Sequence, residues 1–208
     1  AAFDLVVSKA EPFTGIALKY NTEKEAKKTK IATGVAVQLG KINISFIGAG
    51  SYAQGNLLPN IPEIKDVARV GVLTNTGTTS KRVAEKFKFQ FCATKEEDVL
   101  DDKTNTVFVA TRHDSHGPYV LKSLNANKNV FVEKPLCLLE SELEAIIEAQ
   151  AEANKTLMVG FNRRFSPLTA KLKKALGNNP MTMLYRVNAG AIPGDNWIQD
   201  LETGGGRV

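Results

Sequence analysis

The chain has 208 residues, 43% hydrophobic and 24% charged, a balance typical of globular proteins that fill a hydrophobic core. The formal net charge is +5, but much of the excess lies in residues 23–30 (EKEAKKTK), where no aromatic side chains are interleaved. This distribution argues against a nucleic-acid partner and favours a solvated linker, while the positive charge suits anionic small molecules such as nucleotides.

The sequence also argues against membrane and metal functions. No run approaches the ~18–20 apolar residues needed to cross a bilayer, and the first residues lack the regions of a signal peptide. Cys92 and Cys137 have neither metal-ligand nor disulfide spacing. We therefore expect a cytoplasmic protein with no metal site and no membrane partner.

The beginning of the chain predicts little that could fold alone. Residues 1–9 have the pattern of a helix and residues 14–20 that of a strand, and a basic linker is expected over 21–40. Since the chain has no initiating Met and ends abruptly at LETGGGRV, we interpret it as part of a longer protein.

Residues 41–160 alternate between strand-like and helical patterns. Strands are predicted over 42–48, 67–73, 89–94, 106–111, 129–134 and 156–161, and helices over 52–58, 80–87 and 117–127. Another helix is predicted to begin at Ser141, where Ser141 and Glu144 form an S-x-x-E capping box; its apolar stripe is Leu143, Ile146, Ile147 and Ala151. Strands separated by helices indicate an α/β fold, a doubly wound parallel sheet of the Rossmann type.

The pattern changes after residue 161. A helix is predicted over 163–176 and a strand over 181–190, followed by glycine-rich coil. We interpret residues 161–208 as the incomplete start of an α+β substrate domain.

The first predicted strand ends in FIGAGSYAQG, which places Gly48, Gly50 and Ala53 in G-x-G-x-x-[G/A] spacing. Gly48 allows a tight turn, Gly50 lets the backbone approach a pyrophosphate, and Ala53 permits close helix–strand packing. The following helix N-terminus offers free N–H groups to the phosphates. The strand-then-helix context favours a dinucleotide site over a purely structural turn.

The second predicted strand lacks the acidic residue that usually binds the ribose hydroxyls. From Thr74 to Arg82 there is no Asp or Glu, so nothing there repels a 2′-phosphate. Lys81 or Arg82 would attract that phosphate, unless the two are only the solvated start of a helix. The cofactor is therefore NADP or NAD, with NADP slightly favoured.

Two further loops are expected at the carboxyl edge of the sheet, where open α/β sheets bind ligands. One is TRHDSH after the strand at 106–111, and the other is the Glu133-Lys134-Pro135 step after the strand at 129–134. Lys134 is thereby brought near the nicotinamide end of a cofactor, with Pro135 holding the corner. A lysine that only caps the strand end is the alternative.

Five motifs in order, GAGSYA, VATRHDSH, VFVEKPL, GFNRRFSP and GGGR, give residues 42–208 a strong resemblance to the glucose–fructose oxidoreductase/inositol dehydrogenase (Gfo/Idh/MocA) family. The resemblance implies hydride transfer between NAD(P) and a hydroxyl-bearing carbon of a sugar, cyclitol or nucleotide sugar, in a homo-oligomeric full-length protein. It implies that Lys134 is catalytic and hydrogen-bonds the reacting oxygen. The candidate cofactor-binding residues are Gly48, Gly50, Ser51, Tyr52, Ala53, Thr74, Ser80, Lys81, Arg82, Ala110, Thr111, His116, Glu133, Lys134 and Pro135.

The substrate side is less defined. In GFNRRF the resemblance assigns Arg164 to the cleft, with Asn162 and Arg163 as lesser candidates and an anchoring ion pair as the alternative. Trp197, the only tryptophan, is a candidate for sugar stacking or for interior packing.

The chain also departs from the family pattern. The family's Thr-Pro-Asn-x-x-His loop reads Thr111-Arg112-His113-x-x-His116 here, so Arg112 and His113 do not match. The family's acid/base histidine should fall just after Val208. We therefore expect this chain to bind a cofactor better than it turns over a substrate, and a non-catalytic NAD(P)-binding module remains an alternative.

Residues 1–20 are similar to the closing helix and strand of medium-chain, often zinc-containing, alcohol dehydrogenases. This similarity implies an excised piece of a bi-domain oxidoreductase in which that domain precedes the Gfo/Idh/MocA domain. An ordinary N-terminal extension is the alternative.

Overall fold

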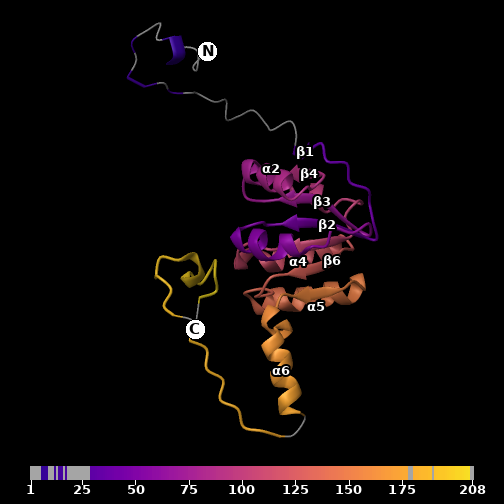
Figure 1. Ribbon diagram of the computed structural model, residues 1–208, viewed down its shortest axis with the longest axis vertical. Helices are drawn as coiled ribbons and strands as arrows, with labels where there is room; N and C mark the ends of the chain where they lie inside the picture. Colours follow the sequence, from indigo (N-terminus) through magenta and orange to yellow (C-terminus); the bar gives the residue numbers. More distant parts are fainter. Residues whose placement is uncertain are drawn as a thin grey trace.

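The centre of the protein is a seven-stranded sheet. The computed structural model describes residues 6–8, 12, 14, 15, 17, 29–177, 180–188 and 190–206. The strands are β1 (Lys30–Ala32), β2 (Ile42–Ile47), β3 (Val67–Leu73), β4 (Phe91–Ala93), β5 (Thr106–Val109), β6 (Asn129–Val132) and β7 (Leu157–Val159). They lie in the order β1-β4-β3-β2-β5-β6-β7, and all pairs are parallel except β1 with β4 (Figure 1). The predicted doubly wound α/β fold is confirmed.

Helices cover both faces of this sheet because its apolar strands bury side chains on both sides. The helical elements are η1 (Ala53–Leu57), η2 (Leu58–Asn60), α2 (Gly77–Lys86), α3 (Glu96–Val99), η3 (His113–Ser115), α4 (His116–Asn125), α5 (Glu140–Ala153), η4 (Asn162–Phe165), α6 (Pro167–Leu176) and η5 (Trp197–Gln199). The elements η1, η2 and α2 contribute to the core on one face, whereas α3, α4 and α5 contribute on the other.

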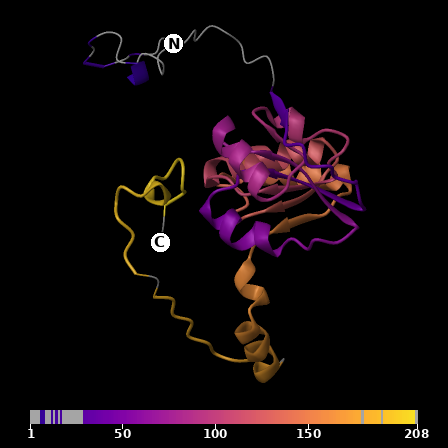
Figure 2. The same cartoon turned by 45° about the horizontal axis from the view of Figure 1, so that its top comes forward.

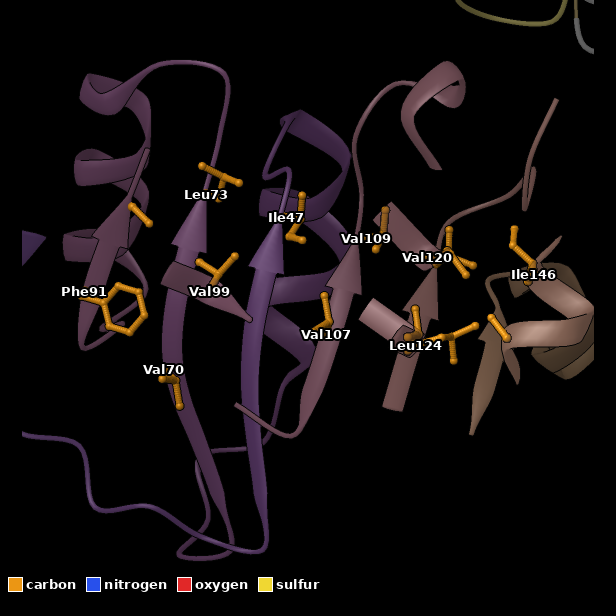
Figure 3. Packing of buried hydrophobic residues seen from close by; sticks show 14 of the residues in the cluster. Ile47, Val70, Leu73, Phe91, Val99, Val107, Val109, Val120, Leu124 and Ile146 are labelled. Atoms are coloured by element: carbon orange, nitrogen blue, oxygen red, sulfur yellow. The ribbon is translucent and has the colours of Figure 1, made fainter. Parts of the chain in front are cut away.

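The two cores differ in character. The core under α3, α4 and α5 is mostly aliphatic, with Phe91 as its buried aromatic side chain. Figure 3 shows Val120 and Leu124 beside Val107 and Val109, and Ile146 on the far side of them. On the opposite face a row of aromatic rings crosses three strands. Phe46 stacks on Phe108 with 4.8 Å between ring centroids, and Phe108 stacks on Phe131 at 4.9 Å. These contacts hold β2, β5 and β6 in register below the edge where the strands end.

The strand order reverses direction at β2, which lies between β3 and β5. The chain runs from β2 outward to β3 and β4 on one side, and returns to β5, β6 and β7 on the other. A crevice therefore opens outside the carboxyl ends of β2 and β5, the usual ligand position in open α/β sheets. The loops after β2, β3, β5 and β6 all reach this edge.

The predicted start of α5 is wrong by one residue, and its predicted cap is wrong. The helix begins at Glu140, and the Glu142 carboxylate accepts hydrogen bonds from the backbone N–H groups of Leu138 and Leu139 at 3.1 and 3.3 Å. Glu142, two residues before the predicted Glu144, thus supplies the carboxylate that satisfies the free backbone N–H groups at the start of the helix. Of the four residues in the predicted apolar stripe, only Ile146 is buried, whereas Leu143, Ile147 and Ala151 are exposed. The sheet therefore covers only one edge of the stripe.

Two further predictions are corrected. Residues 30–32, assigned to the basic linker, form the edge strand β1, in which Lys30 lies over the Phe91 ring and pairs with Asp101 at 2.6 Å. Conversely, the described residues of 181–190 form no strand, and Leu184 is 88% exposed. A strand needs a neighbour for its backbone groups, and no described segment pairs with this one.

Two described segments lie outside the sheet. Figures 1 and 2 both show α6 projecting away from the sheet, and the segment around Trp197 returning to its side. The predicted helix over 1–9 and strand over 14–20 lie mostly outside the described residues, so the relation to alcohol dehydrogenases stays a prediction. None of the helices in the described part of the chain has the length and apolar character needed to cross a membrane.

Candidate functional site

The loop after β2 has the geometry expected of a phosphate-binding turn. Gly48 has φ +84°, a left-handed conformation that favours glycine, and its N–H donates to Leu73 O at 2.8 Å. A Cβ at Gly48 would collide with the carbonyl of Ala110 on the neighbouring loop. Gly50 is exposed, and a Cβ built there meets no atom within 4 Å. The two glycines thus differ: the first is required by the fold, and the second faces open space.

A helical segment over residues 51–60 follows the loop directly. Ala53 is 1% exposed and packs against the sheet, as the spacing predicts. Gln54 fixes the loop, since its backbone N–H donates to Gly50 O at 3.0 Å and its side-chain amide donates to Ala49 O at 2.8 Å. Ser51 and Tyr52 are exposed at the start of this segment, where N–H groups are free of intrahelical partners.

The loop after β3 is held by hydroxyl groups. Ser80 Oγ accepts from the Thr74 backbone N–H at 2.8 Å, and Thr76 Oγ1 accepts from Thr79 N–H at 3.2 Å as the cap of α2. Ser80 is fully buried, and its side chain supports the loop from below. Contact of Ser80 with a cofactor stays a prediction. Lys81 and Arg82 are exposed in the second turn of α2 rather than at its start, because the helix begins at Gly77.

His116, at the start of α4, braces the two remaining loops. Its Nδ1 donates to Pro135 O at 2.6 Å, and its Nε2 lies 3.3 Å from Thr111 O. The side chain is only 1% exposed, which suits a positioning role; direct contact of His116 with a cofactor stays a prediction. Burial lowers the pKa of His116, outweighing the hydrogen bonds that favour the charged ring.

This burial predicts a pH effect on stability. The folded pKa of His116 is below the 6.5 of a free histidine, so the unfolded state binds more protons and the free energy of unfolding falls as pH drops below about 6.5. Denaturant unfolding at pH 7.5 and 5.5 should show this loss in the wild type and a smaller one in His116→Gln. Equal losses in the wild type and in His116→Gln would contradict the prediction.

The loop after β6 presents Lys134 to solvent at the same edge. Lys134 is exposed, and its peptide bond to the half-buried Pro135 is cis. Glu133 is half-buried and directed at Gly160, where a Cβ would lie 3.0 Å from Glu133 Oε1. Burial raises the pKa of Glu133, partly offset by the hydrogen bond and charge of Lys134. Its role as a cofactor contact stays a prediction.

A cleft of about 740 Å³ lies between this loop and the segment around Trp197. It is lined by His113, Lys134, Pro135, Leu138, Gly160, Phe161, Asn162, Arg163, Arg164, Val187, Ile198, Gly204, Gly205 and Gly206. Lys134 and Arg164 are thus brought together. Trp197 is not among these residues: it packs edge-on against His113 with ring centroids 4.9 Å apart, which supports the packing alternative over sugar stacking.

The observed site fits a dinucleotide. Open space beside Gly50, a tight turn at Gly48 and a following helical segment are what a pyrophosphate needs. Within the described part of the chain, no group of three or more His, Cys, Asp or Glu side chains is arranged to hold a metal ion.

A comparison with protein families shows to which family the chain belongs. Residues 42–161, more than half of the chain, match the Gfo/Idh/MocA model, an oxidoreductase family with an NAD-binding Rossmann fold. The chain belongs to this family.

Relatives within the Gfo/Idh/MocA family include dehydrogenases of cyclitols. The scyllo-inositol 2-dehydrogenase (NAD(+)) of Bacillus subtilis is 30% identical over 128 residues, covering 61% of this chain and 36% of that enzyme. The inositol 2-dehydrogenase of Paracoccus denitrificans is 26% identical over 163 residues, covering 76% of this chain and 48% of that enzyme. The chain thus spans less than half of the length of these relatives.

A solved structure has the same fold. A 3-ketoreductase from Actinomadura kijaniata, in complex with TDP-benzene and NADP, superimposes with a TM-score of 0.60 and 22% identity, covering 65% of this chain and 43% of that chain. At this identity the likeness shows the fold alone.

Sequence reasoning missed part of the cleft of this Gfo/Idh/MocA chain. His113, noted only as a departure from the family pattern, lines the cleft, and its Nδ1 lies 2.7 Å from Gly204 O. The neighbouring Asp114 N–H donates to Thr203 O at 3.0 Å. The position of His113 in a loop at the carboxyl edge was the available signal, but its partners lie about 90 residues later in the chain.

Proposed function

We propose that the protein is an NAD(P)-dependent oxidoreductase that transfers a hydride between a nicotinamide cofactor and a hydroxyl-bearing carbon of a sugar, cyclitol or nucleotide sugar. The observation that carries the proposal is the open space beside Gly50, at the same sheet edge as the exposed Lys134. The cofactor, when bound, supplies the hydride acceptor or donor. Relatives named as inositol dehydrogenases support the substrate class.

In this proposal, Lys134 acts on the reacting oxygen. Its ammonium group lines the cleft and forms no ion pair with any described carboxylate, so it is free to donate a hydrogen bond. A cation at that oxygen stabilises negative charge that develops during reaction. His116 assists by holding Pro135 O, which fixes the loop that carries Lys134.

We assign the adenosine end to the loop between β3 and α2. Thr74 and Thr76 present hydroxyls there, no carboxylate occurs from Thr74 to Arg82, and Lys81 and Arg82 are exposed on the next helix. Lys81 is only loosely paired with Glu85, at 3.9 Å. These features favour NADP over NAD.

A fluorescence titration of the chain with NADPH and NADH tests both function and cofactor choice. We expect NADPH to bind more tightly, and a Lys81→Gln, Arg82→Gln double variant to weaken NADPH by about tenfold while leaving NADH unchanged, since only NADPH has the 2′-phosphate. Tighter binding of NADH would remove the phosphate role of these two residues. Failure of both cofactors to bind would refute the proposed function.

We further propose that residues from 161 onward begin a substrate domain. The helix α6 carries apolar side chains that the described residues leave uncovered; Leu168 is 76% exposed and Leu172 48%. A substrate domain that packs on α6 would bury them.

A further inference from the structure

A second cavity, of about 440 Å³, lies at the amino edge of the sheet, opposite the loops proposed to bind the cofactor. Because β2, β3 and β4 are parallel, the helical segment over 51–60 and α2 each return the chain to the edge where the next strand begins. The cavity lies between the turn that leads from η2 into β3 and the end of α2. Its volume is in the range of sites that hold small molecules.

Part of the cavity wall is apolar. Pro59, Ile61 and Pro62 line it from the turn, and Phe87 lines it from the segment after α2. Lys86 Nζ lies over the Phe87 ring, 4.9 Å from its centroid. Such a wall gains little from a bare, hydrated ion and favours a ligand with an apolar body.

The charged groups of the cavity are mainly cationic. Arg69, Lys86 and Lys88 line it, and Glu63 is the one carboxylate among its lining residues in the described part of the chain. Glu63 Oε1 is shared, since it lies 3.3 Å from Arg69 Nη1 and 3.6 Å from Lys88 Nζ. Three cations and one carboxylate leave an excess of two positive charges, and a cavity with such walls attracts anions.

Arg69 has N–H donors that the described residues do not use. Its side chain is only 11% exposed, and its guanidinium donates to Glu63 Oε1 at 3.3 Å, Phe87 O at 3.1 Å and Ile61 O at 2.9 Å. These bonds join both walls of the cavity and fix the guanidinium. Since a guanidinium has five N–H donors, two remain after these three bonds. An oxyanion in the cavity would satisfy them.

Lys88 has a backbone conformation that suits other residues better. It follows α2 with φ +58°, in the left-handed region. The residues in this conformation after α4 and α5 are Asn127 and Asn154, and asparagine tolerates it with less strain than lysine does. The end of the helix therefore does not explain a lysine at this position, whereas its charge beside the cavity does.

We propose that the cavity lined by Arg69, Lys86 and Lys88 binds a small organic anion. Its flat apolar body lies against Phe87 and the prolines, and its carboxylate or phosphate group faces the three cations. This site lies at the opposite edge of the sheet from the cofactor loops. The inference thus goes beyond the proposed function and does not depend on it.

Two-dimensional NMR titration of the isotope-labelled chain with benzoate, phenyl phosphate and benzyl alcohol tests this inference. The first two carry an anion on a benzene ring, and the third carries a neutral group on the same ring. The amide signals of Ile61, Phe87 and Lys88 should shift with at least one anion, which should bind about tenfold or more tightly than benzyl alcohol. Which anion does so separates carboxylate from phosphate recognition. Acetate and inorganic phosphate, which lack the ring, should bind about tenfold or more weakly than that anion.

Substitutions of the cationic residues assign the binding to this cavity. Lys86→Gln and Lys88→Asn should each weaken binding of the anion by about tenfold. Lys88→Asn should also raise the denaturant midpoint of the free protein, because asparagine relieves the strain. Lys103→Gln is the matched control, since Lys103 is exposed before β5 at the same edge of the sheet but does not line the cavity. The control should bind the anion as the wild type does.

Four results would overturn the inference. The first is the absence of shifts at Ile61, Phe87 and Lys88 with both anions, including shifts confined to the loop around Gly50, which would place the anion among the cofactor loops. The second is binding of benzyl alcohol as tight as that of the anions. The third is anion binding that survives both lysine substitutions. The fourth is a Lys88→Asn protein without a gain in stability, because the fold would then explain the lysine.

Discussion

Replacing Gly50 with valine is expected to lower the affinity for both NADPH and NADH by at least about a hundredfold while leaving the fold intact. A Cβ at Gly50 meets no protein atom within 4 Å, so there is room in the folded protein where the added side chain begins. It does occupy the space through which a pyrophosphate would approach the backbone of the loop. The loss is expected for both cofactors because they share that pyrophosphate.

Fluorescence titration with each cofactor measures the loss, and denaturant unfolding verifies that the variant is folded. Gly55→Ala is the matched control: Gly55 also has no atom within 4 Å of a built Cβ, but it lies in η1, beyond the loop. The control should bind both cofactors as the wild type does. Unchanged cofactor binding by a folded Gly50→Val protein would show that the loop is only a tight turn.

The sheet could be predicted from sequence because its signals are local. Each buried parallel strand is a short apolar run, and each is separated from the next by enough chain for a helical crossover. Strand β3 was predicted with the observed bounds. The errors arose where the pairing of strands decides whether a segment becomes a strand. Lys30–Ala32 is too short and too basic to be predicted as a strand from its own sequence. It becomes a strand only because β4 offers it a free edge.

The candidate site was predictable in its loops but not in the burial of its side chains. Spacing alone brought Gly48, Gly50 and Lys134 to one edge of the sheet, since parallel strands end together. By contrast, Ser80 and His116 are fully buried supports, and that depends on how α2 and α4 pack. The contact of Trp197 with His113 joins segments 84 residues apart, which no local pattern encodes.

Substituting Gly48 by alanine should destabilise the protein by about 2–5 kcal/mol, whether or not a cofactor is present. The residue has φ +84°, which costs any other amino acid strain, and the new methyl group would overlap the Ala110 carbonyl and lie 2.7 Å from Thr111 Cγ2. Ala110 cannot retreat easily, because its N–H donates to Ile47 O at 2.8 Å and it directly follows β5, which is held by β2 and β6.

Denaturant unfolding of the chain without cofactor measures this effect, since a ligand would mask part of it. Gly55→Ala serves again as the control and should be neutral or slightly stabilising, because alanine is the better helix former. A Gly48→Ala protein with wild-type stability would mean that the loop after β2 relaxes at little cost. In that case the fold would no longer explain why residue 48 is a glycine. The open space beside Gly50 could then not be assigned to a ligand either, because that assignment assumes a rigid loop.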